Sequence, residues 1–208
     1  AGDEDGNGYY WDLDGSNNLV RKSTTTDPLT FSLAGAGTVA DPYLVASYTD
    51  LKQASLRLDK AYKLTADINL SGQNFYMLGS YLNRFTGNVN GNVKTISNIT
   101  INAPTVDYVG FIGYNAGGTV AALTLANVTL SAHNYTGGVS GYLENGRISE
   151  SYVTGSVAGN NMVGGLIGSL RFDGGGAATS LRVNANITGA NYIGGIAGYT
   201  YEYFAGGV

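Results

Sequence analysis

Apolar and β-branched residues alternate with polar ones in short stretches along the second half of the chain, and Gly or Asn interrupts them. The clearest apolar positions are Ile96, Ile99 and Ile101, then Val120, Leu123, Leu125, Val128 and Leu130, and then Ile148, Val153 and Val157. A period near two is typical of strands, whose successive side chains point to opposite faces. The pattern therefore predicts a mainly β chain of short strands joined by tight turns.

A short block recurs along the chain, with an aromatic residue or Met first, Gly third and a further Gly at its end. The copies are 85–91 (FTGNVNG), 108–113 (YVGFIG, one residue shorter), 135–141 (YTGGVSG), 162–168 (MVGGLIG) and 192–198 (YIGGIAG). Their first positions are 23, 27, 27 and 30 residues apart. Self-similarity at such a period is typical of stacked-repeat architectures.

A repeat of this length cannot bury its own apolar face, so neighbouring repeats must stack. Parallel strands stack about 4.8 Å apart, and parallel crossovers are almost always right-handed. The sequence therefore predicts a right-handed parallel β-helix (β-solenoid) of about five rungs, with a body roughly 24 Å long.

Two columns of like residues support this register. Directly before the first block position stand Asp107, Asn134, Asn161 and Asn191, with Arg84 in the first copy. Asn and Asp tolerate left-handed backbone, and when stacked they could pair between rungs. The third block position holds Gly87, Gly110, Gly137, Gly164 and Gly194. A recurrent Gly marks a positive φ or a close backbone approach, so we assign both columns a structural role.

The segments before the repeats have a different character. We divide the chain into an acidic leader (1–32), an N-terminal cap with the first strands of the solenoid (33–84), and the repeats (85–208), interpreted as a fragment of a longer array. The cap is predicted to contain one short helix, over 50–58, and then a strand over 62–70. Thr49 or Asp50 is the expected N-cap, and the helix would cover the open end of the stack. One helical face carries Leu51, Ala54, Ser55 and Leu58.

Composition narrows the classes of function. Only 12% of residues are charged, the net charge is −4 and no run of Lys or Arg occurs, so nucleic acid is a poor candidate partner. No apolar run is long enough for a membrane span, so this segment is not expected to insert into a membrane. The chain has no Cys, which excludes disulfides, thiolate metal sites and Cys nucleophiles. Its single His, His133, stands beside Asn134 in a predicted turn, so neither a Ser-His-Asp arrangement nor a His-based metal site is expected.

The acidic leader contains the start of a calcium-loop pattern. Oxygen ligands at alternate positions converge on one ion where Gly permits a sharp turn, as Gly8 would here. An Asp stands at the twelfth position, where the pattern prefers Glu, so the alternative is a solvated acidic terminus. The predicted calcium ligands are Asp3, Asp5, Asn7, Tyr9 and Asp14.

Two further sets of residues could carry function. A possible ligand surface is formed by Tyr114, Tyr142 and Tyr199, a column interrupted by Ser169. Stacked rings of this kind could receive sugar rings or a protein surface, or could simply pack rung against rung. The turn after the block carries Glu144, Asp173 and Glu202, predicted to lie on one edge, one rung apart. Paired carboxylates about 5–9.5 Å apart serve glycoside hydrolysis, although an exposed corner needs polar residues in any case.

The repeats resemble the GLUG-motif repeats of bacterial surface proteins, which also occur in IgA-cleaving metallopeptidases. The residues that carry the resemblance are 194–199 (GGIAGY) and 164–168 (GGLIG), together with 35–38 (GAGT), 41–43 (DPY), 64–68 (LTADI), 85–87 (FTG) and 90–91 (NG). The match covers about residues 33–208. The resemblance implies a right-handed β-solenoid in an adhesin-like protein and brings no catalytic residues.

These observations predict a non-enzymatic repeat region of a bacterial surface or secreted protein, acting as a stalk or a binding surface. Its expected partner is a host or neighbouring-cell surface protein or glycan. The alternative is a β-helix carbohydrate-active enzyme or a carbohydrate-binding module, an analogy at the level of the fold.

Overall fold

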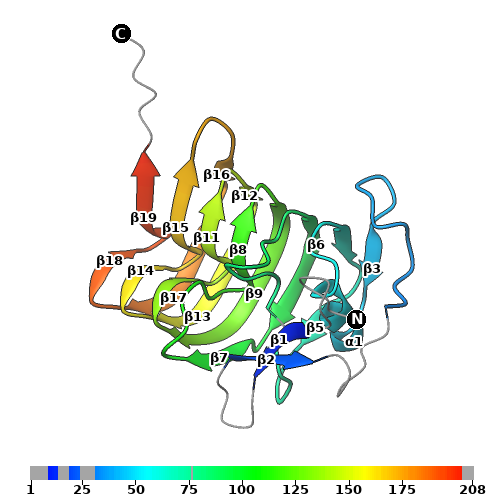
Figure 1. Ribbon diagram of the computed structural model, residues 1–208, viewed down its shortest axis with the longest axis horizontal. Coiled ribbons are helices and arrows are strands. Elements are labelled where there is room, and N and C mark those ends of the chain that lie inside the picture. The colour runs from blue at the N-terminus through cyan, green and yellow to red at the C-terminus, as the bar shows by residue number, and fades with distance from the viewer. Residues whose placement is uncertain (1–8, 14–18, 24–30, 76, 203–208) are drawn as a thin grey trace.

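The structure, a computed structural model, describes residues 9–13, 19–23, 31–75 and 77–202, and side chains within 31–75 and 77–201. Its body is a β-solenoid of about five turns with one short helix near the N-terminal end (Figure 1). The predicted solenoid fold is confirmed.

The strands stack in three parallel sheets. The four-stranded sheet runs in the order β8 (Ile112–Ala116), β11 (Ser140–Glu144), β15 (Ile167–Phe172) and β19 (Ala197–Glu202). The three-stranded sheet holds β10 (Asn134–Gly137), β14 (Asn161–Gly164) and β18 (Asn191–Gly194). The ten-stranded sheet follows β3 (Tyr43–Val45), β4 (Ala61–Leu64), β6 (Asn88–Ser97), β9 (Thr119–Ala132), β12 (Arg147–Ser149) and β16 (Ala177–Thr179). It also includes β5 (Ile68–Asn69), β7 (Thr100–Ala103), β13 (Tyr152–Ala158) and β17 (Arg182–Thr188).

The N-terminal part of the described chain forms an antiparallel hairpin of β1 (Tyr9–Leu13) and β2 (Leu19–Ser23). This hairpin is separate from the three parallel sheets.

The predicted register is right for the later repeats and wrong for the first. Asn134, Asn161 and Asn191 pair in successive rungs, as predicted. Phe85, however, pairs with Asn115 in the following turn, so the block at 85–91 lies in a different column from the others. The segment in register with the block at 108–113 comes earlier, because Leu78 pairs with Ile112.

The helix begins earlier than predicted. Helix α1 spans Tyr48–Ala54, and its N-cap is Ser47 rather than Thr49 or Asp50. The Ser47 hydroxyl accepts the Asp50 amide N–H at 3.2 Å, and the Asp50 carboxylate accepts the Ala46 amide N–H at 3.0 Å, which together satisfy donors at the helix start. The predicted strand over 62–70 is broken into the short strands β4 and β5.

Inward-pointing aliphatic side chains fill the solenoid. Val120, Ile148 and Val153 are completely buried, and the rings of Phe75 and Phe111 stack with centroids 5.6 Å apart. The described part of the chain contains no helix with the length and hydrophobicity that a transmembrane span requires.

The final turn exposes positions that earlier turns bury. Ile193 lies in register with Val163, and their exposed fractions are 46% and 0%. Ile196 is likewise 37% exposed, whereas Leu166, at the same place one turn earlier, is fully buried. Core positions of this turn are therefore partly open to solvent.

Candidate ligand surface

The three-stranded sheet ends at a corner held together by an Asn ladder. The Asn161 side-chain amide donates to Asn134 Oδ1 at 2.9 Å, and the Asn191 amide donates to Asn161 Oδ1 at 2.8 Å. Asn134 Nδ2 in turn donates to Asp107 Oδ1 at 3.0 Å. The predicted pairing of this column between rungs is confirmed.

Left-handed backbone occurs one residue after the ladder, on bulky side chains. Tyr108, Tyr135, Met162 and Tyr192 have φ of 61°, 55°, 57° and 56°. Such a conformation costs roughly 1–2 kcal/mol for a residue other than Gly, and Asn or Asp tolerate it best. The Asp and Asn residues of the ladder, which were predicted to take the left-handed conformation, therefore do not adopt it.

The strained corner positions an outer column of rings. Tyr108 and Tyr135 stack nearly parallel, with centroids 4.5 Å apart and planes 6° apart. Tyr81, from the loop before the first of these rungs, stacks on Tyr108 at 5.2 Å. The outer column thus runs along the solenoid axis at about the rung spacing.

An inner column stands beside the outer one on the four-stranded sheet. Tyr114, Tyr142, Ser169 and Tyr199 are consecutive in register, as the sequence predicted. The rings of Tyr114 and Tyr142 stack at 4.8 Å. The Tyr142 ring also meets Tyr135 of the outer column edge-to-face, at 5.7 Å. The two columns therefore form one continuous aromatic layer.

Gly brings the two sheets into contact beneath this layer. A Cβ on Gly168 of β15 would lie 2.5 Å from the Thr136 nitrogen and from the Tyr135 carbonyl carbon, both on β10. The column at Gly137 and Gly164 likewise reflects close approach, because a Cβ there would overlap the carbonyls of Ser140 and Ile167. Of the two predicted reasons for this column, close backbone approach is the one observed.

Both columns lack a ring in the same rung. Met162 takes the place of Tyr in the outer column, and Ser169 takes it in the inner column. Tyr201 of β19 covers this gap, because its ring lies 6.3 Å from Tyr142 and 4.7 Å from Tyr199. Ser169 is fully buried.

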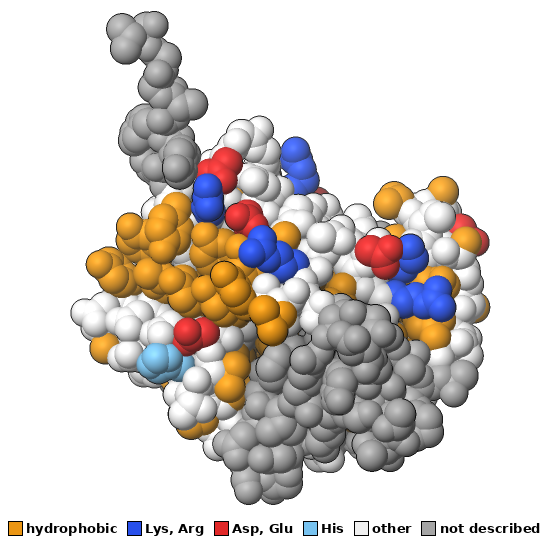
Figure 2. All heavy atoms as spheres, in the orientation of Figure 1, with side chains coloured by type: hydrophobic (Ala, Val, Ile, Leu, Met, Phe, Trp, Pro, Cys, Tyr) orange, Lys and Arg blue, Asp and Glu red, His pale blue; other side chains and the backbone are white. Residues whose placement is uncertain are grey.

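We call this aromatic layer the tyrosine face. It consists of Tyr81, Tyr108, Tyr114, Tyr135, Tyr142, Tyr192, Tyr199 and Tyr201. Figure 2 shows hydrophobic side chains gathered in one broad patch, with charged side chains along its margins. Tyr81 and Tyr192 are 52% and 56% exposed, so rings at both ends of the outer column are accessible to solvent.

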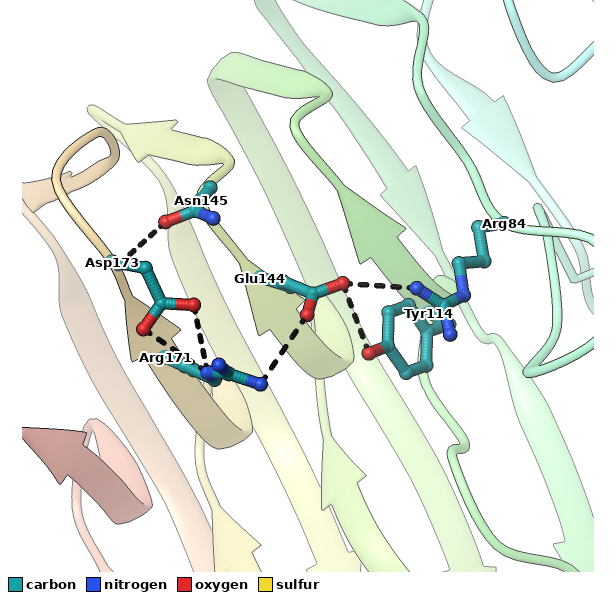
Figure 3. Close-up of polar contacts among 6 residues, drawn as sticks. All are labelled: Arg84, Tyr114, Glu144, Asn145, Arg171 and Asp173. Carbon is teal, nitrogen blue, oxygen red and sulfur yellow. Dashed lines mark hydrogen bonds and ion pairs between the residues drawn. The ribbon is translucent and has the colours of Figure 1, made fainter. Parts of the chain in front are cut away.

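A row of alternating charges borders the tyrosine face (Figure 3). Glu144 contacts Arg84 at 3.0 Å and Arg171 at 3.8 Å, and Arg171 contacts Asp173 at 2.8 Å. Tyr114 joins the row to the face, since its hydroxyl donates to Glu144 at 3.1 Å. We call Arg84, Glu144, Arg171 and Asp173 the charged row.

Arg84 lies where the charged row, the tyrosine face and a pocket meet. Its guanidinium carbon lies 4.4 Å from the centroid of the Tyr114 ring. It also helps to line a pocket of about 330 Å³, whose other lining residues are Leu56, Arg57, Leu58, Asp59, Leu82, Asn83 and Thr86. Arg84 therefore connects the tyrosine face with this pocket.

Burial raises the pKa values of five phenols of the face. It raises the pKa of Tyr142 to about 12 and raises the pKa of Tyr114, with the negative charge of Glu144 adding to the effect at Tyr114. The pKa values of Tyr108, Tyr135 and Tyr201 are also raised, again mainly by burial. At ordinary pH these side chains are therefore neutral O–H groups.

The structure brings together the three predicted surface residues Tyr114, Tyr142 and Tyr199, but the first two are more buried than a docking platform needs, at 5% and 9% exposure. Sequence reasoning did not assign a role to the outer column. Its signal was present, because Tyr or Met opens four of the recurring blocks.

The three predicted acids, Glu144, Asp173 and Glu202, are not aligned with one another across the rungs. Glu144 lies in register with Arg171 rather than Asp173, and Arg171 stands between the two acids. Glu202 lies in register with Phe172. The three acids lie at or directly after the ends of the successive strands β11, β15 and β19, on one edge as predicted. They are out of register with one another because they stand 9, 11 and 10 residues after the first position of their blocks.

The predicted calcium ligands lie outside the described residues, apart from the backbone of Tyr9 in β1. Within the described part of the chain, no group of three His, Asp or Glu side chains could hold a metal ion. His133 contacts the Asp107 carboxylate, with 2.8 Å between His133 Nδ1 and Asp107 Oδ1.

The fold and the surface define this chain as a segment of parallel β-solenoid with an aromatic face. No family model matches the chain. Halomucin of Haloquadratum walsbyi (strain DSM 16790 / HBSQ001) is 40% identical to it over 166 residues. The match covers 72% of this chain and 2% of Halomucin, so the chain spans a small fraction of that relative.

A solved structure has the same fold. The crystal structure of a "putative immunoglobulin A1 protease" from Bacteroides ovatus matches with a TM-score of 0.63 at 22% identity. The match covers 81% of this chain and 64% of that one, and at this identity it shows the fold alone. The solenoid implied by the GLUG resemblance is therefore found in a known structure, while membership of that family stays a prediction.

Proposed function

We propose that the chain is part of the repeat region of a secreted or cell-surface protein and that its tyrosine face is a binding surface. The observation that carries this proposal is the outer column. Tyr108, Tyr135 and Tyr192 occupy backbone positions that Asn or Gly would adopt at lower cost. Strained residues that persist at a surface motivate a hypothesis of function, and here the strain sets the position of the rings.

A bare stalk accounts less well for the same features. Contiguous exposed apolar patches on soluble proteins often mark interaction sites. A stalk also needs no charged row beside its rings, whereas a binding surface combines aromatic contact area with hydrogen-bonding groups at its edge.

An extracellular setting is supported by composition and by similarity. The chain is rich in Gly, poor in charge and free of Cys. Its relative Halomucin is by name a mucin, and mucins are secreted or surface proteins.

Catalysis is the weaker candidate. Paired carboxylates in glycoside hydrolysis need separate tasks, one as acid and one as base or nucleophile. Here Glu144 is shared by Arg84 and Arg171, and Asp173 is paired with Arg171. Both acids are therefore engaged in ion pairs at the border of the face.

The proposal is tested on the cells that produce the protein. Antibodies against the purified chain should label intact cells or the medium, and the fluorescent chain should bind the outside of the same cells. Tyr135→Asn should weaken that binding, while Tyr152→Asn, which changes a Tyr on β13 of the ten-stranded sheet, should not. Labelling only after permeabilisation, or equal binding by both variants, would contradict the proposal.

A further inference from the structure

We infer that the ligand of the tyrosine face is a neutral polysaccharide, lying along the solenoid axis across successive rungs. The inference rests on the proposed binding function and names its ligand class. Three features lead to it: the chemistry of the rings, their regular spacing, and the balance of charge around them.

The rings supply both kinds of contact that a sugar needs. A pyranose ring has apolar C–H faces and a rim of hydroxyl groups. Tyr81 and Tyr192 offer exposed ring surface, and neutral phenol hydroxyls offer hydrogen bonds at its edge. An aliphatic patch would offer only the first kind of contact.

The spacing of the rings fits a polymer. Rings of the outer column stack 4.5 Å and 5.2 Å apart along the axis. This distance is set by the strand spacing of parallel sheets. It is close to the length of one pyranose unit in an extended chain, so successive units can meet equivalent groups.

The charges favour a neutral ligand. In the charged row each guanidinium is matched by a carboxylate: Arg84 with Glu144, and Arg171 with Asp173. Asp107 adds a carboxylate beside the outer column. A polyanion would meet these carboxylates at both margins, whereas sugar hydroxyls can donate to carboxylates and accept from guanidinium groups.

Met162, where the outer column lacks a ring, can be replaced to make a variant with stronger expected binding. Met162 lies in register between Tyr135 and Tyr192, at the same left-handed φ. Met162→Tyr would therefore continue the column with a fourth Tyr of the same geometry. If the column binds a polymer, this ring should strengthen binding several-fold.

The experiment is affinity electrophoresis of the full chain in gels containing one polysaccharide each. Mixed-linkage β-glucan, galactomannan and dextran are the neutral probes, and polygalacturonate and hyaluronate are the acidic ones. At least one neutral polymer should retard the chain. Tyr135→Asn should weaken that retardation about tenfold in apparent affinity, and Met162→Tyr should strengthen it. Tyr152→Asn is the matched control and should change nothing.

The outcomes separate this inference from the proposed function. Retardation by acidic polymers alone, or concentration-dependent self-association abolished by Tyr135→Asn, would overturn the neutral-glycan inference while retaining a binding face. Retardation that Tyr135→Asn and Tyr152→Asn reduce equally would overturn both. Because Asn favours the left-handed backbone, Tyr135→Asn should fold, and a thermal melt of each variant verifies this.

Discussion

Tyr108 and Tyr135 stack with ring centroids 4.5 Å apart, although each residue has a positive φ. Stacking of aromatic pairs contributes about 0.5–1.5 kcal/mol, and left-handed backbone costs roughly 1–2 kcal/mol per residue. For the pair, a backbone cost of about 2–4 kcal/mol outweighs the gain from one stacking contact, so the outer column adds little to stability.

The first prediction concerns this balance. Tyr135→Asn should change the free energy of unfolding by no more than about 1 kcal/mol, because lost stacking is offset by relieved backbone strain. Tyr142→Ala, in the buried inner column, should cost about 3 kcal/mol. Urea unfolding measures both values. A loss for Tyr135→Asn as large as that for Tyr142→Ala would show that the outer rings are structural.

The second prediction concerns the Asn ladder. Asn161 donates to Asn134 and accepts from Asn191, so Asn161→Ala removes two hydrogen bonds. The expected loss is about 1–2 kcal/mol, measured by urea unfolding. Asn184→Ala changes an exposed Asn on β17 and serves as the control. Equal effects of the two substitutions would mean that the ladder does not stabilise the stack.

The third prediction concerns the contact between sheets. A Cβ on Gly168 would overlap the backbone of β10, so Gly168→Ala should destabilise the protein by about 1–3 kcal/mol or more. Gly175→Ala is the control, because a Cβ there meets nothing within 4 Å. Thermal unfolding distinguishes the two. An unchanged melting temperature for Gly168→Ala would contradict the close approach of the two sheets.

The fourth prediction concerns alkaline pH. The folded-state pKa of Tyr142 is raised to about 12, above the value near 10 of an unfolded chain. The contribution of such a phenol to stability is fully present below about pH 10 and is lost as pH rises through about 12. The ionisation of Tyr142 should therefore leave the denaturation midpoint nearly independent of pH below about pH 10 and should lower the midpoint above it.

A double variant, Tyr114→Phe with Tyr142→Phe, provides the control, because it removes two phenols with raised pKa values. Its stability should fall less steeply between about pH 10 and 12. The same slope in the variant and the wild type would exclude these two groups as the cause.

The fifth prediction concerns calcium, for which Asp3, Asp5 and Asp14 are among the predicted ligands. Calcium added to chelator-treated protein should bind saturably in calorimetry and raise the melting temperature. Replacing Asp3 and Asp5 by Asn should remove both effects. Heat without any shift in melting temperature, or a shift that survives the substitutions, would exclude a structural site in this loop.

Much of the fold could be predicted from sequence because the repeat itself encodes it. Asn134, Asn161 and Asn191 mark one position per turn, and the structure pairs them as expected. The left-handed conformation was predicted for the Asn column, but it occurs one residue later, mostly on Tyr. The prediction failed because Asn adopts this conformation at lower cost than Tyr. The conformational preferences of single residues could not predict that Tyr would take this position.

Other parts depended on distances that a repeat does not specify. Phe85 resembles the first residue of a block, but an irregular loop precedes it and shifts it into the column of Asn115. The contact between Arg84 and Glu144 joins residues 60 positions apart and arises only when that loop is placed. Tyr81, in the same loop, joined the tyrosine face for the same reason.

The most direct test of the central claim is an NMR titration of the chain with ring-labelled Tyr against soluble mixed-linkage β-glucan, with signals assigned by Tyr→Phe variants. If the tyrosine face is the binding surface, the signals of Tyr81, Tyr108, Tyr135 and Tyr192 should shift saturably. Those of Tyr62, in the core, and Tyr152, on β13, should stay in place. Shifts confined to Tyr152, shifts of equal size throughout, or no shift at any concentration would contradict the account.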